Sequence, residues 1–124
     1  MISFDSFKTS GNQPIYIEIL DYIKRGAVAG TICDGDELPS RRVLSALLGI
    51  NPNTVQKAFR ILEDEGLVSS RSGAKSFMTL SEDKIAELRS ELLAEDIKGV
   101  IVKLRQAGIS KEEAAELITR NWED

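Results

Sequence analysis

Residues 49–66 read GINPNTVQKAFRILEDEG, and this stretch decides the fold. Asn51 is a favourable N-cap, and Pro52 suits the first helical position because its missing N–H costs no hydrogen bond there. Gly66 is a typical residue just beyond a helix end. The stretch therefore predicts a helix that begins at Pro52 and runs to about Glu65.

This helix has two chemically distinct faces. At 100° per residue, the apolar side chains cluster on one side: Val55, Ala58, Phe59 and Leu62. The opposite side, within about 60° of one direction, carries Asn53, Gln56, Lys57 and Arg60. Amides pair with adenine edges and cations with guanine edges in the major groove, and a helix N-terminus favours phosphate. The pattern predicts a helix that reads DNA.

Any amphipathic helix exposes a polar face, so the polar face alone is weak support. The absence of acids between residues 53 and 60 is what favours DNA. The acids Glu63, Asp64 and Glu65 come only at the far end, and we expect them to point away from the phosphates.

Two further helices are predicted upstream. Ser40 is the N-cap of a short helix over residues 41–48, which Gly49 ends. About three residues around a glycine then separate two helices, which is the spacing of a helix-turn-helix. Before it, we expect a helix from about residue 13 to 29, with Asn12 as its cap, Pro14 in its first turn and a stop at Gly30.

A hairpin and a helical tail are predicted downstream. One strand begins at Leu67, and its partner strand covers residues 77–80. A turn lies between them at 72–74, with Arg71 and Lys75 near the tip. A helix follows from Ser81 to Gly108, with a bend allowed at Gly99, and Ser110 caps a last helix. The fold class is mainly α with a small β-wing. Residues 1–80 form a winged helix-turn-helix domain, and residues 81–124 form a two-helix dimerisation tail, in which Trp122 is a core or dimer anchor.

Composition excludes most catalytic chemistry. The chain has 124 residues, 42% hydrophobic and 29% charged, with no histidine and one cysteine, Cys33. Histidine is the commonest general base and zinc ligand, so we expect no enzyme, no metal and no cofactor. We expect Cys33 to be a partly buried thiol. With no secretory signal and no membrane-length apolar run, we expect a cytoplasmic protein without a membrane partner.

The charge is unevenly distributed along the chain. Residues 38–76 carry 6 basic and 3 acidic groups, a net +3, whereas the whole chain has a net charge of -4. An acidic chain should not bind nucleic acid indiscriminately, and its basic segment is the one that holds the helix-turn-helix and the hairpin.

Four segments resemble GntR-type winged helix-turn-helix regulators. They are Pro14-Ile15-Tyr16, GDELPSRR at residues 35–42, LGINPNTV at 48–55 and AFRILEDEGLV at 58–68. The resemblance covers about residues 12–80, and the short two-helix tail resembles the YtrA subgroup. It implies a homodimeric transcriptional regulator of double-stranded DNA, a repressor that in this subgroup often controls operons for ABC-type transporters.

The resemblance also implies roles for individual residues. Ser40 and Arg42 match positions that hold the DNA backbone and reach a guanine. Positions that enter the major groove match Asn51, Asn53, Thr54 and Gln56. Wing positions at the minor groove or its phosphates match Arg71 and Gly73. Arg41 replaces an apolar family residue and adds a phosphate contact, whereas Pro52 stands where some members have a base-reading arginine.

The combined DNA-binding set has twelve members: Ser40, Arg41, Arg42, Asn51, Asn53, Thr54, Gln56, Lys57, Arg60, Arg71, Gly73 and Lys75. The cations Arg41, Arg42, Lys57, Arg71 and Lys75 position the backbone, while Asn53, Gln56 and Arg60 read bases. The alternatives are a winged-helix module that docks proteins, a small hydrolase and a metabolite-responsive regulator. The roughly 44 residues after Leu80 leave little wall for an effector pocket, so we expect no small-molecule effector.

Overall fold

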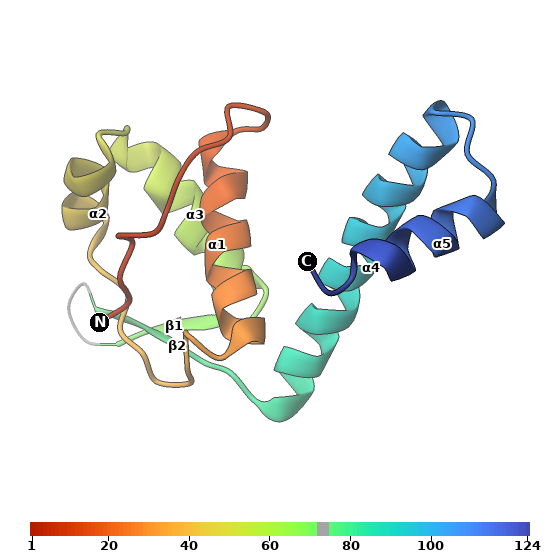
Figure 1. Ribbon diagram of the computed structural model, residues 1–124. Helices are drawn as coiled ribbons and strands as arrows, with labels where there is room; N and C mark the ends of the chain where they lie inside the picture. The colour runs from red at the N-terminus through yellow and green to blue at the C-terminus, as the bar shows by residue number, and fades with distance from the viewer. Residues whose placement is uncertain (72–74) are drawn as a thin grey trace. The chain divides into compact units, whose positions relative to one another are not determined.

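The computed structural model describes residues 1–71 and 75–124 and confirms a mainly helical fold with a two-stranded antiparallel wing (Figure 1). Its elements are α1 (Ile15–Ala29), α2 (Arg41–Leu48), α3 (Pro52–Asp64), β1 (Val68–Ser70), β2 (Ser76–Met78), α4 (Glu82–Gln106) and α5 (Lys111–Asn121). The chain divides into two compact units, Met1–Arg89 and Ser90–Asp124.

The predicted start of the first helix is wrong. Pro14 occupies the N-cap position with a ψ of 144°, and α1 begins at Ile15 without a side-chain cap. The residue before a proline is pushed out of the helical region, so the helix cannot include residue 13. The predicted end is confirmed, because Gly30 adopts a left-handed φ of 84°.

The predicted caps of the helix-turn-helix are confirmed. The Ser40 hydroxyl accepts from the Val43 N–H at 3.1 Å, and the Asn51 side chain accepts from the Asn53 N–H at 2.8 Å. Gly49 ends α2 with a φ of 66°, a conformation that costs little only for glycine. These local signals fix both ends of the link between α2 and α3.

The core of the first unit lies between the three helices. The inner face of α3 is fully buried at Val55, Ala58 and Leu62. These side chains pack in one cluster with Ile19 and Ile23 of α1 and Leu44 of α2. The burial predicted from the helical period is therefore confirmed.

The N-terminal segment joins this core without forming a helix or strand. Ile2 and Phe4 are buried, and the Ile2 N–H donates to the Glu37 carbonyl at 2.8 Å. Phe4 stacks on Tyr22 of α1 with ring centroids 4.9 Å apart. This segment has no periodic pattern, so sequence analysis did not anticipate its burial.

The hairpin has a short register, with Val68 opposite Met78 and Ser70 opposite Ser76. The predicted return strand at 77–80 is displaced toward the turn. Leu80 lies beyond it and is buried, with its N–H donating to Asp34 Oδ1 at 2.8 Å. The predicted turn at 72–74 lies outside the described residues.

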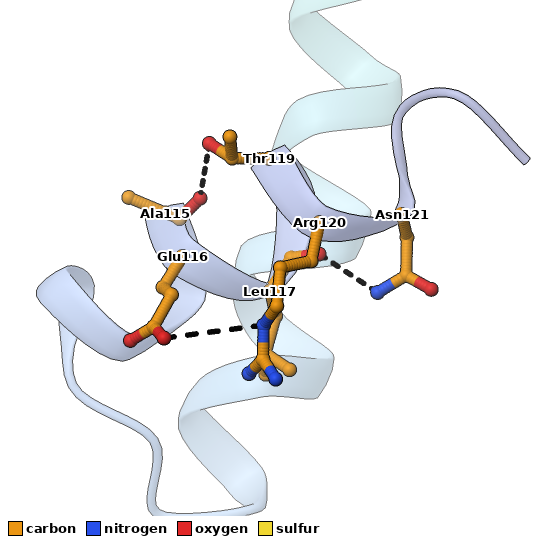
Figure 2. A network of polar contacts seen from close by, with 6 residues as sticks. All are labelled: Ala115, Glu116, Leu117, Thr119, Arg120 and Asn121. Atoms are coloured by element: carbon orange, nitrogen blue, oxygen red, sulfur yellow. Dashed lines mark hydrogen bonds and ion pairs between the residues drawn. The ribbon is translucent and has the colours of Figure 1, made fainter.

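The second unit contains the C-terminal part of α4 and the whole of α5. α4 runs without interruption through Gly99, and the Ser110 hydroxyl caps α5 by accepting from the Glu113 N–H at 3.2 Å. Along α5, Thr119 and Asn121 donate to the backbone carbonyls of Ala115 and Leu117 (Figure 2). These bonds are internal to the helix, which buries none of its residues.

Three further features of the described residues relate to expectations from the sequence. Cys33 is exposed, so the prediction of a partly buried thiol is wrong; its N–H donates to Asp36 Oδ2 at 2.7 Å in a turn that runs over the surface. Residues 1–71 and 75–124 contain no cluster of three potential metal ligands. Within the same residues, the helices lack the combination of length and apolar character that crossing a membrane requires.

Candidate nucleic-acid interface

The outer face of α3 is open to solvent at the predicted positions. Asn53, Lys57 and Arg60 are exposed, while Thr54 and Gln56 are half-buried. The opposite face is buried in the core, so the helix cannot rotate to hide these polar groups without exposing Val55 and Leu62. α3 therefore presents amides and cations outward in a fixed orientation.

Two of the predicted residues contact each other across the helix-turn-helix. The Arg41 guanidinium, in the first turn of α2, donates a hydrogen bond to Gln56 Oε1 on α3. A guanidinium has donors only, so the carbonyl oxygen of the amide faces Arg41 and its nitrogen is turned away. Arg41 thus orients the Gln56 side chain, a pairing that sequence reasoning missed because the two residues lie on different helices.

Lys57 is held from the other side. Its ammonium lies over the ring of Tyr16 on α1, with Nζ 4.0 Å from the ring centroid. A cation over an aromatic face at this distance gains roughly 0.5–1 kcal/mol when exposed. The contact keeps Lys57 close to the α1–α3 junction, and Tyr16 is a supporting residue that the face of α3 alone could not reveal.

The caps place Ser40 and Asn51 at the starts of α2 and α3. Both side-chain oxygens accept backbone N–H groups of those helices. Arg42 follows Arg41 in the first turn of α2 and is exposed. The starts of α2 and α3 are therefore both capped by side chains, and the start of α2 also carries two exposed cations.

The wing carries two cations, Arg71 before its tip and Lys75 after it. The Arg71 side chain lies over the ring of Phe77, with the guanidinium carbon 4.7 Å from the centroid. The backbone N–H of Arg71 donates to the Lys75 carbonyl at 2.9 Å. Arg71 and Lys75 are both exposed. Gly73 lies outside the described residues.

A polar groove of about 360 Å³ connects α2, α3 and the wing. It is lined by Ser40, Arg41, Gln56, Phe59, Arg60, Glu63, Asp64, Ser70 and Ser76. Among the acids at the end of α3, Glu65 pairs with Lys24 at 2.9 Å. Glu63 and Asp64 line the groove instead, where the wing folds back on α3 and the Ser70 hydroxyl donates to Glu63 Oε2 at 3.2 Å. That the three acids point away from the phosphates stays a prediction.

Comparison with known proteins places this arrangement in a family. The sequence model described as "Bacterial regulatory proteins, gntR family" matches residues 15–77, from α1 to the second strand of the wing. The chain belongs to the gntR family. It is a DNA-binding transcriptional regulator of the helix-turn-helix type, and the family is one of regulators rather than enzymes.

The similarity extends into the tail of this gntR-family protein. It is 32% identical over 105 residues to the uncharacterized HTH-type transcriptional regulator YhcF of Bacillus subtilis, covering 85% of this chain and 87% of the relative. It is 32% identical over 106 residues to the HTH-type transcriptional repressor YtrA of the same organism, covering 85% and 82%. A solved GntR-family regulator from Listeria monocytogenes superposes with a TM-score of 0.79 at 28% identity, covering 90% of this chain and 98% of its own.

Proposed function

We propose that two copies of this chain bind a near-palindromic operator and repress the adjoining genes. In each half-site α3 enters the major groove and the wing lies against the neighbouring backbone or minor groove. The half-sites are about one helical turn apart, roughly 34–36 Å. One observation carries the proposal: α3 holds Asn53, Gln56 and Arg60 outward while its other face is locked in the core.

The proposed contacts divide into two groups. Arg42, Lys57, Arg71 and Lys75 neutralise phosphates, and Asn53, Thr54, Gln56 and Arg60 face base edges. Ser40 and Asn51 act through the helix starts that they cap, whose backbone N–H groups favour an anion. Arg41 acts both toward phosphate and on the Gln56 amide, and Gly73 belongs to the wing tip that approaches the backbone.

The homodimer is supported by the tail. Seven large apolar side chains of the second unit are exposed: Leu93, Ile97, Val100, Ile101, Val102, Ile118 and Trp122. Leu93, Ile97, Val100 and Leu104 follow one another at spacings of four and three residues, which forms a single stripe on a helix. We therefore propose residues 1–80 as the DNA-binding domain and residues 81–124 as the tail that pairs two copies.

Repression and the class of regulated gene rest on similarity. YtrA of Bacillus subtilis is named a repressor, and the chain resembles it through the tail as well as the DNA-binding domain. The YtrA-like resemblance makes operons for ABC-type transporters the first to examine.

The experiment is a fluorescence-anisotropy titration of the full chain with labelled DNA from upstream of its own gene and with unrelated DNA of equal length. We expect tight binding to the upstream DNA only, and a plot of log K against log salt with a slope near -7 if each protomer neutralises about four phosphates. Equal affinity for both DNAs would overturn recognition of a specific operator, and absence of binding to either DNA would instead favour a protein-docking winged helix.

A further inference from the structure

Trp122 is the most exposed large apolar residue of the tail. It is 76% exposed, and it is the one tryptophan in the sequence. It follows the last residue of α5 and is itself followed by two acids, Glu123 and Asp124. A solvent-exposed indole beside carboxylates resembles an anchor for a pocket with a cationic rim.

The second unit contains such a pocket. A groove of about 470 Å³ lies between the end of α4 and the start of α5. Its apolar wall is formed by Ile101, Leu104, Ile109 and Ala114. Arg105 and Lys111 also line the groove and give it two positive charges.

The indole cannot reach the groove of its own chain. Ala114, in the groove wall, and Trp122 are eight residues apart, which corresponds to about 12 Å along a helix that rises 1.5 Å per residue. α5 is helical from Lys111 to Asn121, so its two ends stay apart. An occupant with the chemistry of Trp122 must therefore come from another molecule.

We propose that the groove receives Trp122 of a second copy of this chain. The carboxylates of Glu123 and Asp124 then lie against Arg105 and Lys111 of the receiving copy. A two-fold axis makes the exchange reciprocal, so each dimer contains two identical contacts. The proposal rests on the homodimer proposed above and states which surfaces form it.

The charges within α5 agree with this assignment. Arg120 lies 3.9 Å from Glu116 one turn earlier on the same helix (Figure 2). The charges of Glu123 and Asp124 are matched instead by the two cations of the groove. A tryptophan in a largely apolar pocket ringed by charged pairs is the usual composition of an interface hot spot.

The single tryptophan provides a direct test. Emission of the full chain is recorded across a dilution series while sedimentation equilibrium measures the dimer fraction. We expect the emission to shift to shorter wavelengths in parallel with dimer formation, because the indole leaves water. A dimer whose emission stays at the wavelength of a solvated indole overturns the groove assignment and leaves the homodimer intact. A chain that stays monomeric overturns both.

A charge exchange tests the pairing. One variant carries Arg105→Glu and Lys111→Glu, and the other carries Glu123→Lys and Asp124→Lys. We expect each variant alone to dimerise about tenfold more weakly, since paired charges become repulsive. An equimolar mixture should recover the dimer and its short-wavelength emission, because in the mixed dimer each of the two contacts again joins a groove and a C-terminal segment of opposite charge.

The charge-exchange experiment has a control variant and a result that would overturn the proposal. Lys103→Glu reverses one cation in the last turn of α4 outside the groove, as each of the two groove substitutions does, and we expect it to leave the dimer fraction unchanged. Failure of the mixture to recover, with both variants showing the unfolding curve of the parent, would overturn the proposal. Trp122→Ala should weaken the dimer by about a hundredfold, as expected when two hot-spot side chains are lost per dimer.

Discussion

The two units of this protein distribute their apolar residues in opposite ways. Met1–Arg89 contains a core in which Ile19, Ile23 and Leu62 are fully buried. Within Ser90–Asp124, all of which is described, Leu92 is the one buried hydrophobic side chain, at 7% exposed. A unit whose apolar side chains are buried can present polar groups on its surface, whereas an exposed apolar stripe is typical of a surface that binds a partner.

The largest expected effect is on the free energy of unfolding, which should depend on which unit carries the substitution. Leu62→Ala removes a fully buried side chain from α3 and leaves a cavity, so the free energy of unfolding should fall by about 2–5 kcal/mol. The free energy of unfolding is measured by urea denaturation of the full chain, monitored by circular dichroism at a protein concentration below the dissociation constant of the dimer. Ile97→Ala is the control; its side chain is 55% exposed, and we expect a change below about 0.5 kcal/mol. Similar losses for both would contradict the contrast.

The second prediction acts on the tail. Ile97→Ser with Val100→Ser places two hydroxyls on the exposed stripe of α4 and should weaken dimerisation by about a hundredfold, through apolar area that the interface no longer buries. Sedimentation equilibrium measures the dimer, and anisotropy with the operator should show a parallel loss. Ser90→Ala, at an exposed polar position of the same helix, is the control. Operator affinity that survives loss of the dimer would show that one protomer suffices.

The third prediction acts on the DNA face. Arg42→Ala should reduce operator affinity by about 1–3 kcal/mol per half-site, since we propose that its exposed guanidinium in the first turn of α2 contacts phosphate or guanine. Anisotropy titration measures it, with Lys98→Ala in the tail as a control that also removes one exposed cation. Unchanged operator affinity in Arg42→Ala would show that Arg42 does not contribute to DNA binding.

The local features of the fold could be predicted from sequence. Asn51 with Pro52, and Ser40 with Gly49, are short-range signals whose hydrogen bonds and dihedral preferences act within a few residues. The buried face of α3 follows from the helical period alone. At the start of α1 the cap signal of Asn12 was overridden, because Pro14 acts on the residue before it.

The contacts that arrange the interface could not be predicted in the same way. Arg41 meets Gln56, and Lys57 meets Tyr16, only because three helices pack at particular angles. The acids Glu63 and Asp64 line the groove because the wing returns across α3, a tertiary consequence that the period of one helix does not contain.

Those two acids give the smallest and most discriminating prediction. Glu63→Gln with Asp64→Asn removes two negative charges from the groove beside Arg41 and Arg60 while keeping side-chain size, and the amide introduced at position 63 retains an acceptor for Ser70. Repulsion of the phosphate backbone acts on any sequence, so affinity should rise by about two- to fivefold for operator and unrelated DNA alike. Glu65→Gln, whose carboxylate pairs with Lys24 instead, should change neither affinity. A rise confined to the operator would place Glu63 or Asp64 at a base edge, and the acidic end of α3 would then read sequence rather than limit how closely the backbone approaches.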